Sequence, residues 1–161
     1  MEGEPPKTRL PQTLVIGGTS FVFDWLDKVY LEKAFQLFLE AQRTGDGYGQ
    51  DEHTREKFME RVQKSVQTTC IIDCTTKELA AVTINEGSLL CRSTRPMLIG
   101  GATVVNKKYR GIGILREIHT LLFRMAPQLG FIGMCIYFFV FIYVIKVLES
   151  VLSCSVSRSK L

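Results

Sequence analysis

A glycine-containing turn, Arg110-Gly111-Ile112-Gly113-Ile114, constrains the fold of this chain more than any other feature. The run from Met97 to Val105 before it is apolar and typical of a strand. After it, Ile114, Ile118 and Leu121 recur at helical spacing. Two glycines let the backbone turn tightly and approach a ligand, and the helix directs unpaired N–H groups and its positive end toward the turn. This arrangement predicts a site for a phosphate or pyrophosphate.

The composition is that of an ordinary globular protein, and 161 residues predict one domain. A net charge of +4 is too small to indicate nucleic-acid binding, and no nucleic-acid partner is expected. The five cysteines are irregularly spaced, with no CxxC pair, so we expect reduced thiols in an intracellular protein. His53 and His119 have no candidate ligand partners, and no metal is expected. Residues 1–12, charged and proline-rich, predict a disordered leader without a secretory signal.

Apolar periodicity predicts strands and helices in a defined order before the turn. Glycines at positions 45, 47 and 49 end the first predicted helix. Asp51 or Thr54 would cap the second predicted helix, and this helix carries Phe58, Val62 and Val66 on one face. The predicted elements are a strand at 14–16, a helix over about 21–42, the second helix, strands at 70–72, 79–84 and 97–105, and a helix from Ile114 to Met125. The expected class is α/β, of the α+β type, with a mixed sheet.

The segment from Val105 to Ile114 resembles the acyl-CoA-binding motif of the GNAT superfamily of N-acetyltransferases, V-x-P-x-x-R-G-x-G-I-G. Arg110, Gly111, Gly113 and Ile114 match that motif directly. The order strand, helix, helix, three strands, helix also matches the superfamily. The resemblance covers about residues 13–134 and implies a GNAT-like mixed sheet, acetyl-CoA as the co-substrate and an amine as the acceptor.

The resemblance also implies roles for individual residues. The backbone of the turn would hold the CoA pyrophosphate, and the preceding strand would pair with the pantetheine arm in a V-shaped cleft. The acceptor amine must lose a proton, and Glu86, just after the strand at 79–84, is the catalytic candidate; a solvated loop carboxylate is the alternative interpretation. The implied cofactor-binding residues are Thr103, Val104, Val105, Arg110, Gly111, Ile112, Gly113 and Ile114.

Two positions depart from the superfamily pattern. Lys107 replaces a proline that only shapes the turn. Leu115 replaces a glycine or alanine that keeps the start of the helix clear of the pyrophosphate. A leucine there would point inward or narrow the site, and the second outcome favours a weakened affinity for CoA.

The loop of residues 45–53 joins the first two predicted helices, the segment that lines the acceptor site in this superfamily. Tyr48, Asp51 and Glu52 are therefore candidates for contacts with an amine. Arg92 is a candidate for contact with an acidic acceptor or with the CoA 3′-phosphate. The alternative interpretations are a flexible turn with a helix cap, and an exposed arginine.

The C-terminal part of the sequence has a different character, because residues 126–145 carry no charge. The resemblance ends after Gly133, where the later strands and a helix with a tyrosine general acid are not evident. Three interpretations are open for the apolar segment, residues 135–153: a buried strand with an atypical tail, a membrane helix over about 129–153, and a non-native end. In the tail, residues 154–161, the terminal Ser159-Lys160-Leu161 matches a peroxisomal address, so the expected location is membrane-associated or peroxisomal.

Three functions are consistent with this sequence. The first is an N-acetyltransferase domain of the GNAT type, weakened by an incomplete acceptor half. The second is a non-catalytic CoA-binding or vestigial protein anchored to a membrane by residues of about 129–153. The third is a nucleotide-binding module of another α/β class, which the lack of a glycine-rich turn near the N-terminus with a later acidic residue disfavours.

Overall fold

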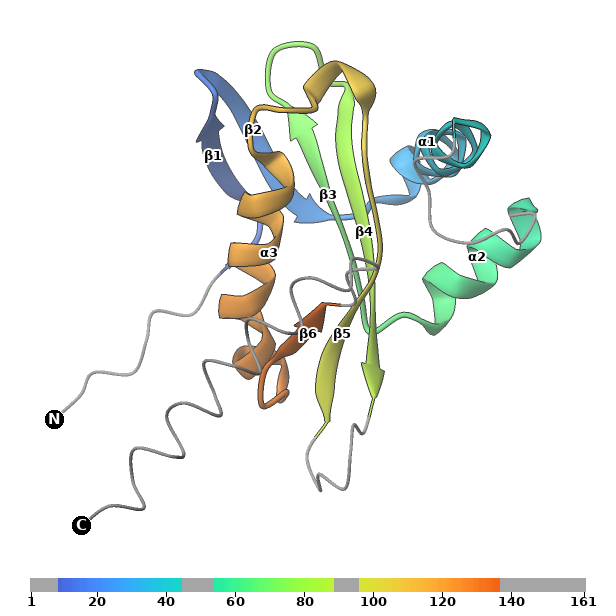
Figure 1. The fold of residues 1–161 in the computed structure, drawn as a ribbon, viewed down its shortest axis with the longest axis vertical. Helices are drawn as coiled ribbons and strands as arrows, with labels where there is room; N and C mark the ends of the chain where they lie inside the picture. The colour runs from blue at the N-terminus through green and yellow to red at the C-terminus, as the bar shows by residue number, and fades with distance from the viewer. Residues whose placement is uncertain (1–8, 45–53, 89–95, 137–161) are drawn as a thin grey trace, which may run out of the picture.

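A computed structural model describes residues 9–44, 54–88 and 96–136 of the chain (Figure 1). Its centre is a six-stranded sheet in the order β1-β2-β3-β4-β5-β6. Each strand is antiparallel to its neighbour except β6, which is parallel to β5. The strands are β1 (Gln12–Ile16), β2 (Thr19–Trp25), β3 (Gln67–Asp73), β4 (Leu79–Ser88), β5 (Met97–Val105) and β6 (Met134–Ile136). The helices are η1 (Lys28–Tyr30), α1 (Leu31–Arg43), α2 (Arg55–Lys64), η2 (Lys107–Tyr109), α3 (Ile114–Met125) and η3 (Ala126–Leu129).

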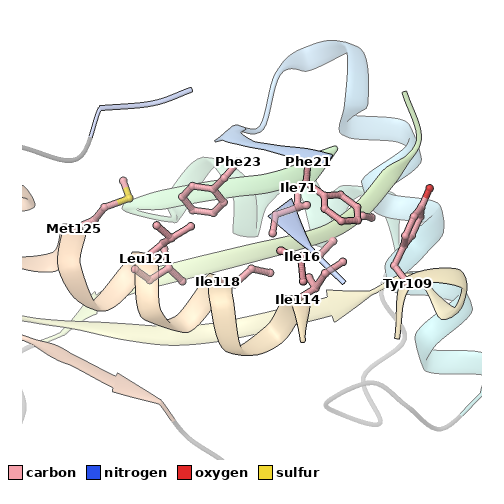
Figure 2. Close-up of a cluster of buried hydrophobic side chains, with 12 residues drawn as sticks. Ile16, Phe21, Phe23, Ile71, Tyr109, Ile114, Ile118, Leu121 and Met125 are labelled. Carbon is pink, nitrogen blue, oxygen red and sulfur yellow. The ribbon is translucent and has the colours of Figure 1, made fainter. Parts of the chain in front are cut away.

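Helices cover both faces of the sheet, with α3 on one face and α1 and α2 on the other (Figure 1). Figure 2 shows Ile118, Leu121 and Met125 of α3 directed at Phe21 and Phe23 of β2. Both phenylalanines are fully buried, and burying such a side chain stabilises the fold by roughly 1.5–3 kcal/mol. The predicted α+β class with a mixed sheet is confirmed.

The prediction of a helix beginning near residue 21 is wrong. Residues 19–25 form β2, and the first long helix begins at Leu31. Phe21 and Phe23 are buried with Val22 between them less so, which is the alternation of a strand. A short apolar run is compatible with the spacing of a helix and with the alternation of a strand. Pairing with β3 makes this segment a strand.

The elements that follow agree with the sequence more closely. Thr54 caps α2, its hydroxyl accepting a hydrogen bond from the Lys57 N–H at 3.3 Å. Val66 lies beyond the end of that helix. The hairpin β3–β4, the strand β5 and the helix α3 all form where the periodicity predicted them.

The C-terminal region was open to three interpretations. Met134–Ile136 forms β6, pairing in parallel with Leu98–Gly100 of β5, so a strand follows Gly133, as in the first of these interpretations. Among the described residues no helix is both long and apolar enough to span a membrane. The rest of the apolar segment, from residue 137 on, and the terminal Ser159-Lys160-Leu161 lie outside the described residues, as does most of the predicted leader.

Candidate functional site

The turn between β5 and α3 has the backbone that the sequence predicted. Gly111 and Gly113 have φ angles of +79° and +102°, in the left-handed region where a side chain would be strained. Gly113 is the N-cap residue of α3, and no side chain caps the helix there. The N–H groups of the first helical turn therefore face the turn without a capping side chain, an arrangement suited to an oxyanion.

A buried tyrosine, Tyr109, fixes this turn to the β3–β4 hairpin. Its hydroxyl lies 2.9 Å from Oδ2 of Asp73 and 2.8 Å from Oε2 of Glu78. Having one proton, the hydroxyl donates to one carboxylate at a time. Its ring packs edge-on against Phe21, with ring centroids 5.7 Å apart. Tyr109 thus connects the turn to the core and to a polar anchor.

The two carboxylates of this anchor are stabilised in their charged forms. Asp73 also accepts backbone N–H bonds from Thr75 and Thr76, and these bonds, that from Thr76 foremost, hold the pKa of Asp73 below its ordinary value. The ammonium of Lys108 has the same effect on the pKa of Glu78. Burial raises the pKa of Tyr109, so the phenol stays protonated.

The basic residues around the turn are less available for an anion than their sequence suggested. Lys108 forms an ion pair with Glu78, and Lys107 forms one with Glu40 of α1, the nitrogen and oxygen 3.4 Å apart. The Arg110 Nε donates to the Val105 carbonyl at 3.0 Å, which ties the turn to the end of β5. The backbone of the turn, rather than a lysine cluster, is therefore its main anion-binding feature.

Strand β5 contains a bulge at Gly101. In its register with β4, Ile84 is opposite Ala102 and Asn85 is opposite Gly100, so Gly101 is an extra residue. A Cβ atom on Gly101 would lie 2.5 Å from the Ile84 carbonyl oxygen, so only glycine fits there.

The bulge changes the faces to which β5 directs its side chains. Leu98 packs on the α3 side with Ala126 and Phe131, whereas Ala102 and Val104 pack on the side of α1 and α2. Without an extra residue, positions 98, 102 and 104 would share one face. The backbone therefore rotates at Gly101, immediately before the predicted pantetheine-binding residues.

The outer edge of β5 is only partly covered. β6 pairs with Leu98–Gly100, and no strand among the described residues pairs with 101–105 on that side. The predicted residues Thr103, Val104 and Val105 lie on this edge, directly before the turn. Thr103 to Val105 lie on this open edge, and the short helix η2 joins them to the other five predicted cofactor-binding residues, Arg110 to Ile114, in the turn.

A chain of hydrogen-bonded polar side chains lies on the α3 face of the sheet and ends on β5. The Thr103 hydroxyl lies 2.9 Å from that of Thr83, which donates to the Asn85 side chain at 3.3 Å. Thr83 and Asn85 are buried. The Asn85 amide nitrogen and the Gln67 amide oxygen have no hydrogen-bond partner among the described residues. Unpaired groups of this kind are uncommon in a core; here they lie opposite each other on β3 and β4, on one side of the strand expected to bind the donor.

Glu86, the predicted catalytic carboxylate, lies within β4 opposite Ile99, and not in a loop after the strand. Its Oε1 is 3.3 Å from Nε of Arg61 on α2. Nη2 of Arg61 is 3.3 Å from where a Cβ on Gly101 would stand. The carboxylate therefore lies near the bulge, on the face opposite α3.

The other predicted acceptor-side residues, Tyr48, Asp51, Glu52 and Arg92, lie outside the described residues. Leu115 is 39% exposed. Among the residues that the structure describes, no group of three or more His, Cys, Asp or Glu side chains could hold a metal ion. Cys70 and Cys74 are free thiols, and burial raises the pKa of the Cys70 thiol to about 12.

Sequence reasoning missed four residues of this region. Tyr109 and Arg61 have partners far away in the chain, which no local pattern indicates. Gly101 carries a signal, since glycine within a strand, here in the pair Gly100-Gly101, often marks a bulge. Arg116, in the first turn of α3, is an exposed cation close to Gly113 that pairs with Glu117 at 3.6 Å, and its position in the first turn of the helix could be read from the sequence.

No protein-family model matches the chain, and no curated protein matches it. The chain does match solved structures. A GNAT-family acetyltransferase from Listeria monocytogenes 4b F2365 is similar with a TM-score of 0.64 at 10% identity, over 86% of this chain and 88% of that chain. Glucosamine-6-phosphate N-acetyltransferase from Arabidopsis thaliana is similar with a TM-score of 0.57 at 14% identity, over 81% and 90%. An acetyltransferase from Trypanosoma brucei gives 0.56 at 13% identity, over 81% and 90%. At these identities the likeness concerns the fold, and this chain has the fold of the GNAT acetyltransferases.

Proposed function

We propose that this chain binds acetyl-CoA along the outer edge of β5 and in the turn before α3, and transfers the acetyl group to an amine. One observation carries the proposal: the bulge at Gly101, the open edge of residues 101–105 and the glycine turn form one uninterrupted stretch. A long ligand with amide groups in its middle and a pyrophosphate at one end matches that stretch.

Each part of the stretch has a role in this proposal. The N–H groups of the turn and of the first turn of α3 hold the pyrophosphate, with Arg110 and Arg116 adding positive charge. The backbone of Thr103, Val104 and Val105 pairs with the pantetheine amides as an added strand would. The thioester then lies near Gly101, where a backbone N–H polarises its carbonyl.

The transfer itself needs no further cofactor. The neutral amine nitrogen attacks the thioester carbon, a C–N bond forms, and the C–S bond breaks with its electron pair going to sulfur. The proton lost by the amine goes to Glu86 or to water, and the CoA thiolate takes up a proton. Glu86 is half exposed and lies near the bulge, on the face away from α3, so it is within the region from which an amine can approach.

The test is calorimetry with acetyl-CoA and the full chain. Wild type should bind, and Arg110→Glu should abolish binding, because it places a negative charge beside the pyrophosphate. Arg124→Glu, the same charge change at the other end of α3, is the matched control and should leave the affinity within about threefold of wild type. Absence of binding by folded wild-type protein would refute the proposal. Thiol release with a panel of amines then tests turnover.

A non-catalytic CoA-binding protein is the second candidate. The observation that favours it is the ion pair between Glu86 and Arg61, which already engages one oxygen of the only predicted catalytic carboxylate. Binding of acetyl-CoA without thiol release for any amine would support this candidate, and release above the rate of hydrolysis would exclude it.

A further inference from the structure

The Arg61–Glu86 pair, taken together with the bulge beside it, suggests the class of amine that the site accepts. We propose that these two side chains recognise a small zwitterion, an α-amino acid, whose ammonium lies on Glu86 and whose carboxylate lies on Arg61. The inference rests on the proposed function, because it assumes a thioester near Gly101.

The two faces of the sheet at the bulge differ in how they admit an amine. On the α3 side of the sheet, the region before the bulge is closed, since Leu98 is fully buried against Ala126 and Phe131. On the opposite face, the Arg61 guanidinium lies at Gly101 itself. An amine that reaches a thioester at the bulge from this face meets Arg61 and Glu86.

Arg61 and Glu86 each keep polar atoms that can still bind a ligand. A single hydrogen bond, from the Arg61 Nε to Oε1 of Glu86 at 3.3 Å, links them. Neither the two Nη groups nor Oε2 of Glu86 has another partner among the described residues. Their side chains are 33% and 50% exposed, so both remain accessible from solvent.

The chemistry of these two side chains defines the ligand that they recognise. The Nη groups of a guanidinium form a planar fork that suits the two oxygens of a carboxylate. A carboxylate in turn accepts from an ammonium group. Because a cation and an anion stand side by side, the complementary ligand carries an anion and a cation side by side, which is the charge pattern of an α-amino acid.

The geometry also suits the reaction. An ammonium on Glu86 can pass one proton to that carboxylate and so become the neutral nucleophile. Attack on the thioester carbon then forms the C–N bond and expels the CoA thiolate, which is protonated to the thiol. The product is an N-acetyl amino acid that has lost the ammonium charge and therefore binds Glu86 less well than the substrate does.

The test compares amino acids with their own α-carboxamides, which keep the ammonium and lose the carboxylate. Calorimetry measures binding of the twenty common α-amino acids and of their carboxamides to the full chain saturated with CoA, so turnover is not required. At least one amino acid should bind more tightly than its carboxamide, by about tenfold or more, as expected for a hydrogen bond to a charged group.

Arg61→Gln should remove this preference while leaving the affinity for CoA unchanged. Arg55→Gln is the matched control: Arg55 lies on the same helix and pairs with Glu32, and its loss should keep the preference. Equal affinity for acid and amide in wild type, or a preference that survives Arg61→Gln, would overturn the inference. If CoA binds and no amino acid does, this inference fails and the proposed function does not. If CoA does not bind, both the proposed function and this inference fail.

Discussion

The donor side and the acceptor side of the candidate site are built in different ways. On the donor side, the turn before α3 is held by Tyr109 and Ile114, both almost completely buried, and by two glycines with left-handed backbone. On the acceptor side, the residues available are Arg61 and Glu86, a half-exposed ion pair on a helix and a strand. Core packing fixes the donor side, whereas two long, solvated side chains make up the acceptor side.

This difference separates binding of the donor from choice of the acceptor. The backbone of the turn keeps its conformation only if the buried residues that pack against it stay in place. Substitutions on the donor side should therefore reduce both the stability of the protein and its affinity for acetyl-CoA. A surface ion pair contributes about 0–1 kcal/mol to stability, so changes on the acceptor side should alter selectivity and leave the fold intact.

The largest effect should come from Gly101→Ala. The new Cβ atom would meet the Ile84 carbonyl at 2.5 Å, and because backbone cannot yield easily, we expect a loss of about 2–3 kcal/mol in the free energy of unfolding. Affinity for acetyl-CoA should fall with it, because the bulge orients the edge of β5. Urea denaturation and calorimetry measure the two effects.

Gly133→Ala is the control for this substitution. The nearest atom to its Cβ would be Cε of Met97 at 4.0 Å, an ordinary contact, so the free energy of unfolding should change by less than about 0.5 kcal/mol. If both variants were equally stable, the bulge would not be a rigid feature of β5.

The next effect should come from Tyr109→Phe. This change removes the hydroxyl that bridges Asp73 and Glu78 and keeps the buried ring, so we expect a loss of about 1–2 kcal/mol in stability. The turn loses one of its attachments to the β3–β4 hairpin while the Lys108–Glu78 ion pair remains, and affinity for acetyl-CoA should decrease. Tyr30→Phe is the control, since that hydroxyl forms no hydrogen bond among the described residues, and it should behave as wild type. An unchanged affinity in Tyr109→Phe would show that the Tyr109 hydroxyl is not needed to hold the turn.

The sequence predicted the strand, the turn and the helix of the candidate donor side because their signals are local. The turn, the strand before it and the helix after it occupy consecutive residues, so periodicity and two glycines suffice to place Arg110 to Ile114. The helix stripe from Ile114 to Met125 is buried as predicted. The hairpin β3–β4 was predictable for the same reason.

What the sequence could not predict depends on contacts between distant residues. Tyr109 meets carboxylates 36 and 31 residues away, and Arg61 meets one 25 residues away. Phe21 and Phe23 fit a helix as well as a strand until β3 pairs with them. On the acceptor side, a lone arginine on a helix looks like any solvated charge, and only the fold brings it to Gly101.

A weaker effect should appear on acidification. Because the folded-state pKa values of Asp73 and Glu78 are lowered, their contribution to stability is present above their unfolded-state values of about 4. It is lost as the pH falls through the lower folded-state values. Urea denaturation from pH 7 down to the acid range should show this decline, and Tyr109→Phe should show a shallower one because the hydroxyl no longer stabilises either carboxylate. Identical pH dependence in both proteins would mean that Tyr109 does not contribute to these pKa shifts.

The smallest effect should come from Thr54→Ala, which tests the acceptor side through the helix that carries Arg61. Loss of the N-cap bond to Lys57 should cost about 0.5–1 kcal/mol and increase hydrogen exchange in the first turn of α2. Thr120→Ala, which removes a threonine hydroxyl bonded to the Arg116 carbonyl within α3, should be close to neutral. Affinity for acetyl-CoA should not change in either variant, because neither touches the turn or β5. A weakened donor affinity in Thr54→Ala would mean that α2 supports the donor side as well, and that the two sides are less independent than their construction indicates.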